Sequence, residues 1–148
     1  MDNLDQKLAD NLLAMNKIPA NSNDIYEYPD FGGKLSIPLL STNGREQFLL
    51  DINRKKISLK VTYQTRGRQI YVLARLDFNS PHRNPDGTEV GVPHLHLYRE
   101  GYGDKWAFPV PEGMLSNPDN AWQNLLDFMD YCHVTQQPQI NHGLFSWH

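Results

Sequence analysis

The chain has 148 residues but a single cysteine, Cys132, and this scarcity excludes an internal disulfide framework and a cysteine-rich zinc site. No apolar run approaches the ~20 residues that a membrane helix needs, so we expect no membrane contact. Residues 1–10 start acidic and lack the apolar stretch of a secretory signal peptide. These absences favour a cytoplasmic protein, and the length favours a single domain over residues 1–148.

The two signs of charge are unevenly distributed. The chain has 14 basic and 17 acidic residues and a net charge of −3. Between Arg45 and Arg83, however, nine basic residues stand against three acidic ones, so this segment carries +6 and the remainder −9. A basic segment in an acidic protein is typical of a surface that meets a polyanion such as RNA, or of one that meets the protein's own acidic part. The alternative is exposed turns, since Arg54–Lys56 and Arg66–Arg68 fall where turns are expected.

Hydrophobic spacing predicts a helix, a block of strands and a second helix. A helical period covers residues 2–16 and returns after Asn117 and Pro118, which are typical first residues of a helix. Between the helices, apolar runs bounded by turn signals predict strands at 34–40, 46–52, 57–64, 69–78, 93–99 and 105–110. Short turns require antiparallel pairing. We therefore expect an α+β fold, with a curved antiparallel sheet of about six strands flanked by an N-terminal and a C-terminal amphipathic helix.

Phase along these segments also predicts the buried side chains. The expected core residues are Ile57, Leu59, Val61, Ile70, Val72, Leu76, Leu95, Leu97, Trp106, Trp122, Leu125 and Met129. If the strands are neighbours, their opposite faces coincide. That second face is expected to carry Lys60, Thr62, Gln64, Tyr71, Arg75, Asp77, His94, His96 and Tyr98.

This polar face has the residue types that cleave RNA through its own 2′-hydroxyl. Histidine titrates near neutral pH, and lysine or arginine stabilises the charge that develops on a phosphate. We therefore predict a metal-independent endoribonuclease of the toxin–antitoxin type that uses no cofactor. The predicted acid–base residues are His94, His96, Tyr98 and His82. The residues expected to bind RNA or nucleotide phosphate are Lys60, Arg75, Arg83, Arg99 and Lys105. Because His96 is expected outside the core, His96→Ala should remove activity and leave the fold intact.

Three alternatives use the same residues differently. His94, His96 and Glu100 have the spacing of the first metal motif of cupins, although the glycines and the second motif of cupins are missing. The face could instead be the docking surface of a non-enzymatic phage or mobile-element inhibitor. The two histidines could also be packed and hydrogen-bonded parts of the sheet.

Three runs resemble a family of small bacterial proteins that is catalogued only as a domain of unknown function. They are Phe48–Arg54, Pro81–Gly87 (PHRNPDG) and Pro93–Ala107 (PHLHLYREGYGDKWA), and the resemblance extends from about Phe31 to Tyr131. It implies no established chemistry. Members of this kind often lie among mobile-element and defence genes, which implies a toxin–antitoxin or phage role. An antitoxin, a host protein and a second copy of the chain are the protein partners that this role suggests. The expected architecture is similar, by analogy alone, to small metal-independent endoribonuclease toxins.

Overall fold

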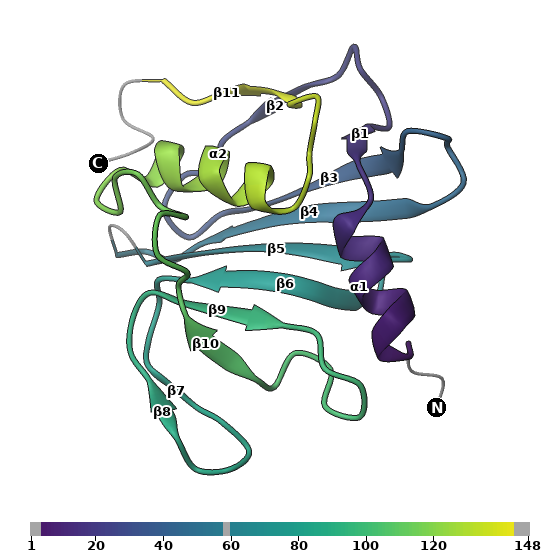
Figure 1. The fold of residues 1–148 in the computed structure, drawn as a ribbon. Coiled ribbons are helices and arrows are strands. Elements are labelled where there is room, and N and C mark those ends of the chain that lie inside the picture. The colour runs from purple at the N-terminus through teal and green to yellow at the C-terminus, as the bar shows by residue number, and fades with distance from the viewer. Residues whose placement is uncertain (1–3, 58–59, 144–148) are drawn as a thin grey trace.

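An antiparallel sheet of seven strands dominates the computed structural model, which describes residues 4–57 and 60–143 (Figure 1). The strand order is β1-β3-β4-β5-β6-β9-β10, and every neighbouring pair is antiparallel. The strands are β1 (Lys17–Pro19), β3 (Lys34–Ser41), β4 (Gln47–Arg54), β5 (Val61–Gly67), β6 (Tyr71–Asp77), β9 (His94–Leu97) and β10 (Ala107–Pro109). The predicted α+β class and antiparallel sheet are confirmed.

Two smaller pairs of strands lie in segments where the sequence predicted no strand. The hairpin of β7 (His82–Arg83) and β8 (Glu89–Val90) lies within the predicted loop between β6 and β9. The strands β2 (Ile25–Glu27) and β11 (Gln139–Asn141) pair in parallel, although they are far apart in sequence. Strands of two or three residues are too short for alternation to show, so the sequence pattern missed them.

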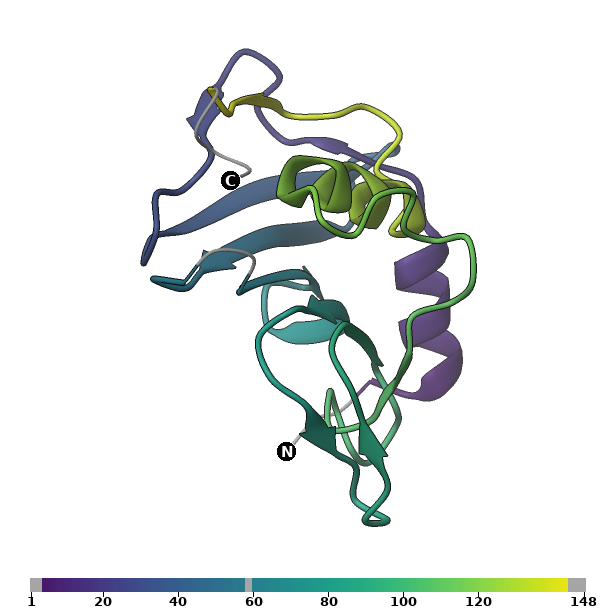
Figure 2. The ribbon, with the colours of Figure 1, turned by 90° about the vertical axis from the view of Figure 1, so that its left-hand side faces the viewer.

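Both helices pack on one side of the curved sheet, as Figure 2 shows. Helix α1 (Gln6–Ala14) begins after Asp5, whose carboxylate accepts a hydrogen bond from Leu8 N at 2.7 Å. Helix α2 (Ala121–Tyr131) begins after Asn120, which serves as the N-cap in place of the predicted Asn117. Their apolar faces cover the sheet and form the core. Within the described residues, neither helix has the length and apolar character needed to cross a membrane.

The predicted core is confirmed in part. Val61, Leu76, Leu95, Leu125 and Met129 are buried. Three others are only half-buried, namely Leu97, Trp106 and Trp122. The prediction is wrong for Ile57 and Ile70, which are 61% and 67% exposed, because both lie in connections rather than in strands. Leu59 lies outside the described residues.

A bulge explains why the alternation of β6 misled the sequence analysis. Thr65 pairs with Ala74, but the next residue, Arg66, pairs with Val72, so Leu73 is an extra residue in β6. Leu73 and Ala74 are therefore both buried. Val72 lies beside Arg66 on the opposite face, so its predicted place in the core is wrong. The preceding strand is also displaced, since β5 covers Val61–Gly67 and not residues 57–64.

Candidate functional site on the open face of the sheet

Two rows of polar side chains cross the face of the sheet opposite the helices, which we call the open face. The register aligns one residue from each of β3, β4, β5, β6 and β9 in each row. The first row is Ser36, Asp51, Gln64, Arg75 and His96, and the second is Lys34, Asn53, Thr62, Asp77 and His94. The prediction that residues 62, 64, 75, 77, 94 and 96 share a face is confirmed, because antiparallel register carries alternation from strand to strand. The prediction is wrong for Tyr71, which packs against the core beside Tyr98.

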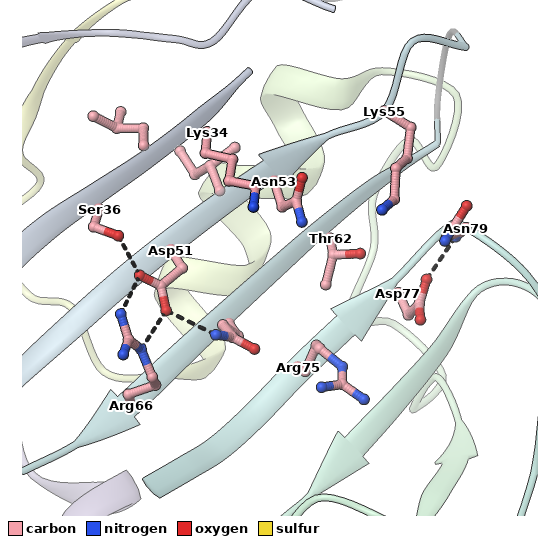
Figure 3. A pocket seen from close by; sticks show the side chains of 13 residues that line it. Lys34, Ser36, Asp51, Asn53, Lys55, Thr62, Arg66, Arg75, Asp77 and Asn79 are labelled. Atoms are coloured by element: carbon pink, nitrogen blue, oxygen red, sulfur yellow. Dashed lines mark hydrogen bonds and ion pairs between the residues drawn. The ribbon is translucent and has the colours of Figure 1, made fainter. Parts of the chain in front are cut away.

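A groove of about 400 Å³ lies over these rows, from β3 to β6 (Figure 3). This volume is within the range of small-molecule sites in proteins. The polar residues that line the groove are Lys34, Ser36, Asp51, Asn53, Lys55, Thr62, Gln64, Arg66, Arg75, Asp77 and Asn79. The groove therefore offers four cationic and two anionic side chains, together with neutral hydrogen-bonding groups.

Asp51 is bound in the groove by a network of hydrogen bonds. Its carboxylate accepts hydrogen bonds from Ser36 Oγ at 2.6 Å, from Gln64 Nε2 at 2.8 Å and from Arg66 Nε at 2.6 Å. Arg66 Nη2 adds a second contact at 3.0 Å, so the pair is bidentate. Burial alone would raise the pKa of Asp51, but the hydrogen bonds from Arg66, Ser36 and Gln64 lower it below its usual value. Asp51 is thus an anion that neutralises Arg66.

The lysines of the groove differ from its two arginines, Arg66 and Arg75, in their partners. Lys34 and Lys55 are exposed, and no ion pair joins either of them to a carboxylate within residues 4–57 and 60–143. Arg75, by contrast, is bound to Asp104 at 2.5 Å. The two lysines are therefore the groove cations that an anionic ligand meets without displacing a protein carboxylate.

His94 and His96 lie beside the groove, on β9, and are packed face to edge. Their Nε2 atoms are 3.1 Å apart. His94 Nδ1 lies 2.9 Å from the carbonyl oxygen of Gly91, and His96 Nδ1 lies 2.7 Å from that of Asp104. A carbonyl oxygen only accepts, so Nδ1 is the donor in both rings. The two residues are 0% and 1% exposed, which the sequence analysis did not expect.

The hairpin of β7 and β8 brings His82 to this pair. The His82 ring lies edge to face with His96, with 4.6 Å between centroids, and its Nε2 donates to Lys105 O at 2.7 Å. Asn84 fixes the hairpin to β10, because its side chain accepts from Ala107 N at 2.8 Å and donates to Ala107 O at 2.9 Å. Of the three rings, only that of His82 is half-buried rather than buried.

Arg75 connects the groove with the imidazole rings. Its Nη2 lies 3.4 Å from His96 Nε2, while its Nη1 donates to Asp104. Burial, reinforced by the positive charge of Arg75, lowers the pKa of His96 to about 4. His96 is therefore neutral at physiological pH, with its lone pair on Nε2.

Two predicted site residues lie elsewhere. Tyr98 belongs to the core on the helix side, where its hydroxyl donates to Leu4 O at 2.7 Å and its ring meets Tyr71 edge to face. Its predicted place beside His94 and His96 is wrong, because the regular pairing of β9 ends at Leu97 and the extra residue of β6 shifts the phase. Glu100 accepts a hydrogen bond from Gln6 N at 2.8 Å, at the start of α1, so the cupin-like ligand set is not assembled.

Of the five residues predicted to bind phosphate, only Arg75 lines the groove. Arg83 is exposed on the hairpin and pairs with Glu89 at 2.9 Å. Arg99 lies over the ring of Trp106, at 4.6 Å from its centroid. Lys60 precedes β5, and Lys105 is exposed in the connection to β10. None of these four side chains lines the groove.

Some residues that shape the site were not predicted from the sequence. Lys34 and Asp51 were assigned to strands without a role, and Arg66 was assigned to a turn. The signal for Arg66 was present, because the alternation of Thr62 and Gln64 continues to it. No sequence signal places Asp104 next to Arg75, since that contact depends on how the loop after β9 folds back.

The comparisons with known proteins bear on the family and not on the chemistry. No curated protein and no solved structure gives a significant match to the chain. A family model does match, over residues 4–134, which include the groove residues and all three imidazole rings. The chain therefore belongs to a family of unknown function (DUF6978).

Proposed function

We propose that this protein binds RNA or a nucleotide in the groove on the open face and acts on it there. The exposed lysines of the groove, Lys34 and Lys55, carry the proposal. Phosphate is the group that such lysines attract, and neutralising it releases counterions, so binding depends on salt. Arg75, at the boundary with the imidazole rings, would approach the same phosphate from the other side.

The neutral lining supports a nucleotide rather than a bare phosphate. Asn53, Thr62 and Asn79 offer amide and hydroxyl groups between the cations. Such groups donate and accept hydrogen bonds, as the edges of bases and the 2′-hydroxyl of RNA require. A groove of about 400 Å³ is large enough for a ligand of this class.

Cleavage of the bound RNA remains a prediction, and burial changes the roles within it. A general acid or base must come within hydrogen-bonding distance of the substrate. His94 and His96 are buried, whereas His82 is half-buried and its Nδ1 is not used in its bond to Lys105. In a metal-free mechanism, His82 is therefore the imidazole that we expect to contact RNA.

Binding of a fluorescently labelled single-stranded RNA, measured by anisotropy at two salt concentrations, tests the proposal. The Lys34→Ala/Lys55→Ala double variant should bind about tenfold or more weakly and reduce the slope of log K against log salt by about 1.4, because each phosphate contact on a single strand contributes about 0.7. The matched control is Lys7→Ala/Arg45→Ala, which removes the same charge from exposed sites outside the groove. The control should bind within about twofold of the wild type.

Two outcomes would contradict the proposal. Equal losses in both double variants would mean that net charge, and not the groove, determines binding. No RNA or nucleotide binding at low salt, together with capture of one stoichiometric host protein, would favour the docking alternative. Following the RNA on a gel, with and without EDTA, measures cleavage separately from binding.

A further inference from the structure

Three potential metal ligands converge where β6 meets β9. Asp77 and His94 are direct partners across the two strands, and His96 is two residues further along β9. One ligand atom from each lies within 4.8 Å of the other two. Asp77 Oδ2 is 3.5 Å from His94 Nε2. Both imidazole rings are buried, and the Asp77 side chain is only 17% exposed.

The Nδ1 hydrogen bonds of the two rings leave the facing Nε2 atoms without a proton between them. Each Nδ1 donates to a backbone carbonyl, that of Gly91 or that of Asp104. A neutral imidazole has one N–H, so in the neutral pair both Nε2 atoms carry lone pairs. These lone pairs face each other at 3.1 Å. Such an arrangement is unfavourable unless a cation or an added proton lies between them.

The distance between the two Nε2 atoms is also the distance expected for two imidazoles that bind one metal ion. Zinc–imidazole bonds are about 2.0–2.1 Å long, so two such ligands at angles of about 90–110° place their nitrogens about 2.9–3.4 Å apart. Histidine ligands also typically donate their second ring N–H to a backbone carbonyl or a carboxylate, which fixes the tautomer and the ring orientation. Both rings here do so, through Gly91 and Asp104.

We propose that Asp77, His94 and His96 bind one divalent transition-metal ion, with zinc as the expected ion. Two imidazoles and one carboxylate suit zinc and its first-row neighbours, and three protein ligands leave a position open. This ligand set replaces the His94, His96 and Glu100 set suggested by the sequence, because Glu100 lies at the start of α1.

Arg75 is a cation close to these ligands. Its Nη2 contact with His96 Nε2 is long, at 3.4 Å, and its charge is matched by Asp104. A metal ion would compete with this weak contact while leaving the ion pair with Asp104 intact. An added proton on His94 Nε2, with Asp77 as counter-ion, is the arrangement that must be distinguished from a metal ion.

This inference is independent of RNA binding, because metal binding is measured without nucleic acid. A metal ion at this site would, however, restrict how His94 and His96 could act in RNA cleavage. An ion coordinated by both Nε2 atoms occupies the lone pairs that acid–base catalysis by His94 and His96 would need. Asp77 also lines the groove, so the ion would lie at the wall of the proposed RNA site.

The test is calorimetric titration of EDTA-treated, metal-free protein with zinc chloride. We expect one zinc per chain with micromolar or tighter affinity, and a higher melting temperature with zinc. Asp77→Asn should weaken binding at least tenfold. Asp77 Oδ1 accepts from Asn79 N at 2.6 Å, and an asparagine oxygen keeps that bond while its amide group takes the place of Oδ2. Glu100→Gln is the control carboxylate substitution and should bind zinc like the wild type.

Long-range ¹H–¹⁵N NMR spectra provide a second readout that does not depend on a variant. When zinc is added to the metal-free protein, the Nε2 resonances of His94 and His96 should shift. Their Nδ1 atoms should stay protonated throughout. The proposal is wrong if zinc does not bind at one equivalent, or if Asp77→Asn binds zinc as tightly as the wild type. It is also wrong if His94 is an imidazolium whose signals do not respond to zinc.

Discussion

His94 and His96 face each other through Nε2 atoms that are 3.1 Å apart, and both rings are fixed from behind by backbone carbonyls. The pair is therefore part of the packing between the sheet and the loops that cover it. The alternation in the sequence predicted these rings on an accessible face, where their removal would leave the fold unchanged. Their burial gives the opposite expectation.

His96→Ala should lower the free energy of unfolding by about 2–4 kcal/mol, because it leaves a cavity and the Asp104 carbonyl without its donor. Urea denaturation in metal-free buffer measures this loss. Lys105→Ala, at an exposed position in the neighbouring connection, should change stability by about 0.5 kcal/mol or less. A His96→Ala protein as stable as the wild type would show that the ring is not part of the packed structure.

Asp51→Asn should strengthen RNA binding while weakening the fold. The substitution removes one negative charge from the groove and releases Arg66 from its bidentate pair, so affinity should rise about two- to fivefold at low salt. The free energy of unfolding should fall by about 1–3 kcal/mol, because charge-assisted hydrogen bonds to a partly buried carboxylate are lost. Anisotropy and urea denaturation measure the two effects. Weaker RNA binding by a folded variant would mean that Asp51 contacts the ligand directly.

The sequence predicted the strands that are long and regularly alternating. For β3 and β4, and for the pairing of Leu95 with Leu76, the period of two residues is clear, and a wrong register would bury charges. Prediction failed where one residue breaks that period. The extra Leu73 in β6 is indistinguishable in sequence from its apolar neighbours, yet it moves Val72 out of the core.

The candidate site was predictable to a similar extent. Arg75, Asp77, His94 and His96 were placed on one face because each lies within a regular strand segment. Burial of the two histidines was not predictable, because it depends on loops that return from elsewhere in the chain. Asp104 and the β7–β8 hairpin make those contacts through backbone carbonyls and ring packing, for which the sequence carries no periodic signal.

Asn84 should control how firmly the β7–β8 hairpin is attached to the sheet. Its side chain makes both hydrogen bonds to Ala107 while it is itself buried. Asn84→Ala should therefore make opening of the hairpin easier by about 1–3 kcal/mol. Hydrogen–deuterium exchange read by mass spectrometry should show faster exchange in peptides covering residues 82–90. Peptides from β3 and β4 should exchange as in the wild type.

If exchange accelerates equally throughout the sheet, the hairpin does not open separately and Asn84 contributes to global stability alone. Asp86→Ala is the matched control on the same hairpin, because Asp86 is exposed and accepts its hydrogen bonds from Thr88 N and Oγ1 within its own turn. The control should leave the contact with β10 intact and increase exchange around the turn only.

Lys17 should make stability depend on pH in the alkaline range. Its ammonium is buried and donates to Leu13 O and Met15 O at 2.8 Å and to Cys132 O at 2.7 Å. Burial lowers the pKa of Lys17 from 10.5 to about 8. Between these two values the unfolded chain binds more protons than the folded one, so the contribution of Lys17 to the free energy of unfolding increases with pH. It is smallest below the folded pKa and complete above the unfolded one.

Comparison with Lys17→Met isolates this contribution from other groups that titrate in the same range. Urea denaturation at about pH 7.5 and about pH 9.5 gives the free energy of unfolding of both proteins. The value for the wild type, minus that for the variant, should be larger at the higher pH. Equal differences at the two pH values would mean that Lys17 keeps an ordinary pKa when folded, and that its three carbonyl partners fully offset the cost of burying its charge.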